Sequence, residues 1–304
     1  MSRRLRIVTA ATFAAVVVSA CTSGSSVPTV IATAAAHPAA SSVASCRSSS
    51  AVVVGVKVDQ FGTGYLDVRN YSYTGFDVDV ADYVSGVLFG NANPYFLPVS
   101  SDTREPVLAS CAIRFFVATY TTTPQRQQNF DVANPYLVTF QGVMVGPHSP
   151  RISTVADLDG KRVCVAGNGS LTEQVLRQNV PHAIPVAVAS YSDCLTQLRD
   201  GNVDAFSTDL AILYGYLTDR ANSGLQIVKG LTIGDPIYYG IAFRKSDHLL
   251  CLRAAAAIKA MLASKQWTAD VNSDLPDYVG DQGLYPGPLQ PTDQEVAQNS
   301  CITP

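Results

Sequence analysis

The feature that most constrains the fold of this chain is a repeated alternation of strand-like and helix-like segments between residues 51 and 264. Short runs of Val, Ile and Ala alternate with stretches whose apolar residues recur at helical spacing. This pattern predicts α/β lobes with largely parallel sheets, which bind ligands at the carboxyl ends of strands. We expect strands over residues 51–56, 113–119, 163–166, 184–188, 203–207 and 237–244, helices over 77–90, 170–178, 192–200, 209–220 and 249–264, and an irregular surface tail from Gly280 onward that Cys301 could pin.

The size and charge of the chain limit its class. At 304 residues it is long enough for two compact lobes, and its hydrophobic and charged fractions of 47% and 15% are typical of packed globular proteins. The formal net charge of −3 gives no reason to expect a nucleic acid or an anionic membrane surface as a partner. No apolar run beyond the N-terminus is long enough to cross a bilayer.

The N-terminus has the pattern of an export signal. Three arginines precede the short apolar run of residues 7–18, which predicts a signal peptide over residues 1–20. The sequence Val18-Ser19-Ala20-Cys21 resembles the lipobox of bacterial lipoproteins, which implies lipidation at Cys21 and an extracytoplasmic, membrane-anchored protein; the alternative is an ordinary signal with a chance cysteine. The composition of residues 21–45 predicts a flexible tether. Without the three arginines, 18 basic against 24 acidic residues leave the mature chain at about −6.

Six further cysteines follow Cys21. An even number in an exported protein favours disulfides over metal ligands or nucleophiles, and no pair has the close spacing of a zinc site. Sequence alone leaves many pairings open. These cysteines are Cys46, Cys111, Cys164, Cys194, Cys251 and Cys301.

Four segments carry motifs that are weak singly and specific together. In order, they resemble the polar amino-acid-binding proteins of ABC transporters, the bacterial extracellular solute-binding family 3, and within it the glutamate-binding group of actinobacterial type. The resemblance covers nearly all of residues 50–270. The motifs are Gly55-Val56-Lys57-Val58-Asp59-Gln60 with residues 73–81, residues 118–126 with Asn134-Pro135-Tyr136 and Gln141-Gly142, residues 157–165, and residues 201–209.

The resemblance implies an α/β, two-lobed periplasmic-binding-protein-like (type II) fold with two hinge crossings. Lobe 1 would comprise residues 46–145 and 236–304, and lobe 2 residues 146–235, with crossings near 145–146 and 236–240. The glutamate-binding group also carries a cysteine pair that matches Cys164 and Cys194. Keeping the other pairs within one lobe leads us to expect Cys46–Cys111 and Cys251–Cys301.

The same resemblance places an amino-acid site between the lobes. Arg126 suits the ligand's α-carboxylate, because a guanidinium donates two parallel bonds to a carboxylate, and Asp209 suits its ammonium. Ser170 lies at a predicted helix N-terminus that favours an anion, while Thr119 and Thr121 lie two apart on an extended stretch and can both face the cleft. Each residue also has a purely structural alternative. Arg126 could be a solvated surface residue, Asp209 could only cap a helix, and the turn before Ser170 could have no role in binding.

Side-chain specificity depends on three further positions. Arg104 falls where glutamate and aspartate binders of the family carry an arginine, and Ser101 falls where some glutamine binders place an aromatic residue; both favour an acidic ligand. Tyr191 is a weaker candidate near a polar position of those relatives. Arg104 could instead form a surface ion pair with Glu105. Residues 110–113 and 166–170 depart from the family pattern.

We therefore expect a monomeric binding protein that closes on a polar amino acid, glutamate before aspartate or glutamine, and delivers it to an ABC permease. No cofactor or metal is expected. An exported enzyme such as a dehydratase is the rival from another class, but no nucleophile elbow, metal triad or phosphate loop is present in the sequence. A ligand sensor that signals to a membrane partner would have an identical site.

Overall fold

The structure of the protein is a computed structural model that describes residues 51–90 and 93–302. The predicted signal peptide, Cys21, the tether and Cys46 lie outside these described residues. Within the described ranges, no helix is both long and apolar enough to cross a membrane.

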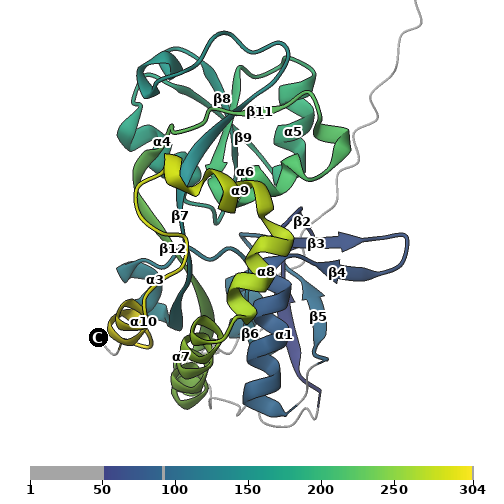
Figure 1. Ribbon diagram of the computed structural model, residues 1–304, viewed down its shortest axis with the longest axis vertical. Helices are drawn as coiled ribbons and strands as arrows, with labels where there is room; N and C mark the ends of the chain where they lie inside the picture. Colours follow the sequence, from purple (N-terminus) through teal and green to yellow (C-terminus); the bar gives the residue numbers. More distant parts are fainter. Residues whose placement is uncertain (1–50, 91–92, 303–304) are drawn as a thin grey trace, which may run out of the picture. The chain divides into compact units, whose positions relative to one another are not determined.

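Nine strands of the described residues form one sheet, in the order β5-β1-β6-β12-β7-β10-β8-β9, with β11 paired to β7 (Figure 1). A second sheet contains β2, β3 and β4. The strands are β1 (Val53–Val56), β2 (Asp59–Gln60), β3 (Gly64–Asp67), β4 (Ser72–Thr74), β5 (Tyr95–Pro98), β6 (Phe115–Phe116), β7 (Phe130–Val145), β8 (Arg162–Ala166), β9 (Ile184–Val188), β10 (Ala205–Asp209), β11 (Gln226–Ile227) and β12 (Ile233–Arg244).

Helices pack on both ends of the large sheet. We call β1, β5 and β6 with α1, α2 and α7 the β1 half, and β8, β9 and β10 with α4, α5 and α6 the β9 half. The helices are α1 (Phe76–Phe89), α2 (Arg104–Ala109), α3 (Pro124–Asn129), α4 (Thr172–Asn179), α5 (Tyr191–Arg199), α6 (Leu210–Leu217), α7 (His248–Ala263), α8 (Gln266–Asp274), α9 (Pro276–Asp281) and α10 (Asp293–Asn299), with 3-10 turns η1 (Val155–Leu158), η2 (Arg220–Asn222), η3 (Lys245–Asp247) and η4 (Gln282–Leu284).

The two long strands β7 and β12 connect the halves. At its start β7 pairs with β12, and from Gln141 to Met144 it pairs with β10, ahead of the crossing expected near residue 145. The expectation of largely parallel sheets holds at the two ends, where β1 pairs in parallel with β5 and β6, and β8 with β9 and β10. It is wrong for the centre, because both connecting strands run antiparallel to their neighbours.

Local sequence signals account for many element boundaries. Helix α1 has Asp77 and Asp79 in its first turn, which suits the positive end of the helix dipole, and ends at Gly90 in the left-handed conformation (φ 66°). The strand expected over residues 113–119 is reduced to β6, and three residues after it the chain turns at Thr119, which adopts φ 46°.

The tail expected to be irregular from Gly280 onward contains the last two residues of α9, the 3-10 turn η4 and the helix α10. Helix α10 begins with a capping box, in which the Thr292 and Glu295 side chains each bond the other residue's backbone N–H. The prediction missed this Thr-x-x-Glu signal among the flanking prolines. From here on, residues 275–302 are called the C-terminal segment.

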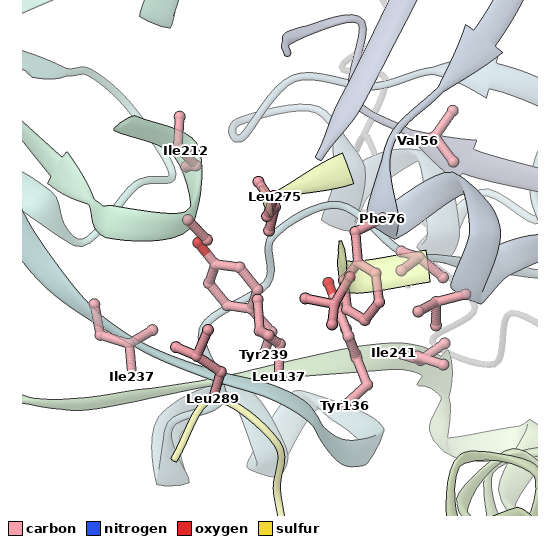
Figure 2. Close-up of a cluster of buried hydrophobic side chains, with 14 of the residues drawn as sticks. Val56, Phe76, Tyr136, Leu137, Ile212, Ile237, Tyr239, Ile241, Leu275 and Leu289 are labelled. Atoms are coloured by element: carbon pink, nitrogen blue, oxygen red, sulfur yellow. The ribbon is translucent and has the colours of Figure 1, made fainter. Parts of the chain in front are cut away.

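A continuous apolar core joins the halves. Figure 2 shows Leu137, Ile237 and Tyr239 of the two connecting strands beside Leu275 and Leu289 of the C-terminal segment, all within one buried cluster. The core therefore includes the tail as well as the two halves.

Two disulfides are present among the described residues, Cys164–Cys194 and Cys251–Cys301, and both are pairings expected above. The first ties β8 to α5 inside the β9 half, and the second ties α7 to the end of the C-terminal segment. Cys111 is also disulfide-bonded, but Cys46 lies outside the described residues, so their pairing stays a prediction.

Candidate ligand-binding cleft

Residues from both halves surround a small polar cavity of about 40 Å³. That volume is close to the share of one or two water molecules, so an amino acid fits only when the surrounding segments separate. The lining brings together six of the eight residues predicted for the site. The lining includes Arg104, Thr119, Thr121, Ser170, Tyr191 and Asp209 of the predicted set, together with Gln141, Thr172, Leu171, Val175 and Ile237.

Two arginines from the β1 half reach the same point of the β9 half. Arg104 donates from Nη2 to the carbonyl oxygen of Gly169 (3.1 Å), and Arg126 donates from Nη2 to the same oxygen (2.7 Å). Both guanidinium groups lie over the ring of Tyr120, with the Cζ atoms of Arg104 and Arg126 4.6 Å and 4.3 Å from its centroid. Burial and the neighbouring Arg104 lower the pKa of Arg126 to about 10, so Arg126 still carries its charge at neutral pH.

Arg104 is not a surface residue. It is 2% exposed, and its Nη1 donates to the carbonyl of Ala118 (2.6 Å). Its Nε is buried and has no hydrogen-bond partner among the described residues. Glu105, the ion-pair partner considered above, instead lies 3.5 Å from Nε of Arg126 and accepts from the Tyr120 hydroxyl. A buried cation with an unpaired donor on a cavity wall is a group that an anionic ligand can satisfy.

Asp209 provides the opposing charge. It ends β10 and is 5% exposed, and its Oδ2 accepts a hydrogen bond from the Tyr239 hydroxyl (2.6 Å). It occupies the N-cap position of α6, as the alternative expected, but its side chain makes no capping bond to the helix. Burial raises the pKa of Asp209 to about 6, which leaves a carboxylate at neutral pH that an ammonium group would stabilise.

Thr119 and Thr121 both line the cavity, but the stretch that contains them, expected to be extended, is not extended throughout. Thr119 has φ 46°, a sparsely populated conformation for a β-branched residue, and its N–H donates to Oδ2 of Asp77 (2.7 Å). The Thr119 hydroxyl donates to Gln60 (3.1 Å). Arg126 fixes Thr121 through a bond to its carbonyl oxygen (2.7 Å). Buried Asp77 thus holds the strained turn that exposes both residues to the cavity.

The loop before α4 closes the cavity from the β9 half. Helix α4 begins at Thr172, two positions after the predicted start, and the Ser170 hydroxyl accepts from the Thr172 N–H (3.3 Å). Gly169 has φ 78°, and a Cβ added there would lie 2.1 Å from the carbonyl oxygen of Ser101. This glycine therefore allows direct backbone contact between the halves.

A second, larger cavity of about 330 Å³ adjoins the first and shares Tyr191 with it. On its wall, Lys57 is 2% exposed and donates to the Ser101 hydroxyl (2.7 Å), and its Nζ lies 5.2 Å from the centroid of the Tyr191 ring. Burial, followed by the positive charge of Arg104, lowers the pKa of Lys57 to about 7. Ser101 lines only this second cavity of the two.

The prediction missed three residues of the site. Lys57 and Gln141 lay within the quoted motifs but were taken as parts of the fold, and Tyr239 carried no signal beyond its strand. Gln141 lines the cavity, is fully buried and donates to the Ser207 hydroxyl, and its Oε1 has no hydrogen-bond partner among the described residues. The signal that could have identified Lys57 and Gln141 is a charged or amide side chain inside an otherwise apolar strand.

The arrangement fits recognition of a small zwitterion better than chemistry. Cations lie on one side and a carboxylate on the other, and no cluster of three metal-ligating side chains occurs in residues 51–90 or 93–302. Neither histidine nor cysteine is among the described residues that line the cavity, and the single carboxylate there, Asp209, accepts a bond from Tyr239.

Comparison with known proteins agrees with the geometry. The model for bacterial extracellular solute-binding proteins, family 3, matches residues 52–272. The glutamate-binding protein GluB of Corynebacterium efficiens is 31% identical over 232 residues, which cover 74% of this chain and 78% of that protein. The glutamine-binding protein GlnH of Bacillus subtilis is 30% identical over 220 residues, covering 72% and 79%. These relatives are binding proteins, not enzymes.

Solved structures confirm the two-lobed type II fold. An ancestral arginine-binding protein bound to glutamine has a TM-score of 0.65 at 28% identity, over 73% of this chain and 96% of that one. The solute receptor for L-cysteine of Neisseria gonorrhoeae, at 23% identity and a TM-score of 0.68, covers 76% and 92% and supports the fold alone. The chain therefore belongs to the bacterial extracellular solute-binding proteins, family 3.

Proposed function

We propose that the protein binds a free amino acid with an acidic side chain, glutamate in particular, and delivers it to an ABC importer. The observation that carries this proposal is the pair of buried or largely buried arginines, Arg104 and Arg126, opposite the buried carboxylate of Asp209. Lys57 lies beside them with a pKa of about 7, so a ligand carboxylate next to it would favour its charged form. A glutamate at neutral pH carries two carboxylates and one ammonium, so this set of charges complements it. The names of the glutamate- and glutamine-binding relatives support the same class.

Each ligand group has a counterpart in the cleft. The α-carboxylate would bond Arg126, with Ser170 and the N-terminus of α4 contributing from the β9 half. The ammonium would bond Asp209, with Thr119 and Thr121 beside it. The distal carboxylate would lie between Arg104 and Lys57, with the hydroxyls of Tyr191 and Ser101 nearby. An amide in that place would leave Lys57 without a counter-charge.

The cellular location and the closing motion of the protein are part of the same proposal. We propose that Cys21 is lipidated, that residues 21–45 tether the protein to the membrane, and that it acts as a monomer. The β1 and β9 halves are the two lobes, with bounds at 46–145 plus 236–304 and 146–235, and ligand closes them by contacting both. A sensor that signals to a membrane partner would use the same closure, and a neighbouring permease and ATPase gene would favour transport over it.

Calorimetric titration of the signal-deleted protein with glutamate, aspartate, glutamine, asparagine and arginine tests the ligand. Binding of the two acidic amino acids with micromolar or lower Kd, and much weaker binding of the amides, is the expected result. Lys57→Met should remove this preference while retaining some binding, because it removes a distal charge only. Lys161→Met, which changes a lysine on the surface loop before β8, is the matched control. Preference of the wild-type protein for the amides would overturn the acidic assignment.

A further inference from the structure

The C-terminal segment lies beyond the part of the chain that the family model matches, which ends at residue 272. It is nevertheless ordered into α9, η4 and α10, and its apolar side chains Leu275, Tyr278, Tyr285, Leu289 and Val296 are buried in the core. A surface extension with no structural role would not bury this many large side chains, because each is held at a cost in conformational entropy.

The segment follows the connecting strand β7. The Tyr278 hydroxyl lies 2.9 Å from that of Thr139, and the N–H of Val138 donates to the carbonyl of Leu289 (2.9 Å). Further along, the Ser300 hydroxyl donates to the carbonyl of Asn134 (2.8 Å). The segment therefore contacts β7 at positions spread along the part that joins the two halves, and Figure 2 shows Leu289 beside Leu137 there.

The segment is also fastened to both halves. In the β9 half, the buried hydroxyl of Tyr214 on α6 bonds Oδ2 of Asp281 (2.9 Å) and the Tyr285 hydroxyl (2.8 Å), and Lys229 forms an ion pair with Asp281 (2.7 Å). In the β1 half, the Cys251–Cys301 disulfide joins the end of the segment covalently to α7. A chain fixed at both ends and laid along the connection must stretch or detach when the halves move apart.

We infer that the C-terminal segment is a brace across the hinge, which limits opening of the cleft and so sets the ligand affinity. This inference rests on the proposed cleft closure, which it deepens by naming a conformational control outside the ligand site. Solute-binding proteins that lack such a segment would need only β7 and β12 to bend. Here a third connection, through Tyr214, Asp281 and the disulfide, opposes that bending.

The brace is tested by the distance between the halves in the ligand-free mature protein. Nitroxide labels on unnatural amino acids at positions 87 and 184, which are 47% and 52% exposed, report this distance by pulsed EPR. Two variants weaken the brace in different ways. Tyr214→Phe removes the two hydroxyl bonds to Asp281 and Tyr285 and leaves the Lys229–Asp281 ion pair. The double change Cys251→Ser with Cys301→Ser frees the other end. Tyr95→Phe, at a surface tyrosine, and Cys164→Ser with Cys194→Ser, within one half, are the matched controls.

Both brace variants should broaden the distance distribution toward longer values, while both controls retain the wild-type distribution. The Kd of the amino acid that binds wild type should rise by roughly threefold to tenfold in the brace variants, since affinity falls with the population able to close. An unchanged distribution in folded Tyr214→Phe and in the cysteine double variant would overturn the brace. If no amino acid narrows the distance distribution of the wild-type protein, the proposed function is wrong. The comparison of the ligand-free variants still tests the brace independently.

Discussion

Asp209 shows how a single buried charge is held ready for a ligand. Its carboxylate is 5% exposed, and its bond from the Tyr239 hydroxyl does not neutralise it. Keeping an ionised carboxyl buried is unfavourable, which is why its pKa is raised. A cationic ligand group beside Asp209 would relieve that cost and so contribute to the binding free energy.

Asp209→Asn should therefore weaken binding of the amino-acid ligand by about 2–5 kcal/mol, which is the cost of removing one partner of a buried charge pair. The fold should remain, because the amide is isosteric and retains an acceptor for Tyr239. Calorimetry gives the Kd, and Asp204→Asn, which alters an ion pair with Arg162 at the surface, is the control. Equal affinities of Asp209→Asn and wild type would remove Asp209 from the site.

Gly169 provides a second test at the residue scale. Gly169→Ala should raise the ligand Kd at least about tenfold, because a Cβ placed 2.1 Å from the Ser101 oxygen keeps the halves apart, in addition to roughly 1–2 kcal/mol of backbone strain. Gly160→Ala is a matched control, since Gly160 also has positive φ but a Cβ there meets no atom within 4 Å. A similar Kd in both variants would show that backbone strain, not contact across the cleft, is responsible.

At the scale of elements, α10 is an addition whose start depends on its capping box. Thr292→Ala removes the side chain that accepts the N–H of Glu295 (3.2 Å) and should lower the free energy of unfolding by about 1 kcal/mol. Urea unfolding measures this change. Gln298→Ala, on an exposed position of the same helix, should leave the midpoint nearly unchanged or slightly raised. If both variants behave alike, α10 does not contribute to global stability.

Elements with a clear local period could be predicted from the sequence. Strand β9 was predicted with its observed bounds, and α1, α5 and α7 within about one residue, because their apolar spacing is regular. Strand β7 was missed because Pro135 and the buried polar residues Asn134, Thr139 and Gln141 interrupt its apolar pattern. These polar groups are tolerated only because partners distant in sequence bond them, and no local window contains that information.

The residues of the site likewise fall into those that could be predicted from the sequence and those that could not. Arg104, Arg126 and Asp209 could be placed from motif order, and the structure brings them to one cleft. Lys57 could not be distinguished from the end of a strand, because its burial results from packing beneath Tyr191, which is far away in the sequence. The strained turn at Thr119 also depends on a distant partner, Asp77.

For the whole molecule, buried carboxyls set an unusual response to pH. Burial raises the pKa of Asp77 and of Asp209 to about 6, above the value of about 3.8 in an unfolded chain. The folded state therefore binds more protons between these values, so stability falls as pH rises through this window. Each of the two groups should contribute on the order of 1 kcal/mol to the fall between about pH 5 and pH 6.5.

Thermal or urea unfolding at about pH 5 and pH 6.5 checks this trend, which should be smaller in Asp209→Asn because one titrating group is gone. Ligand affinity should change in the opposite direction and weaken below about pH 6, since protonated Asp209 cannot pair with an ammonium. Stability that rises with pH over this range would contradict the assignment of these carboxyls as buried and ionised.

The pairing of the connecting strands has a consequence for how such a protein can be rebuilt. Gln141 of β7 and Ile233 of β12 are direct cross-strand neighbours, so the chain enters the β9 half and returns from it at adjacent positions of the sheet. The chain between Gln141 and Ile233 is therefore a continuous insertion, a cassette, in a β1 half that contains both ends of the described chain. The corresponding cassette of a relative could be exchanged at these two residues with a single pair of junctions, moving one wall of the binding site between proteins while the other stays in place.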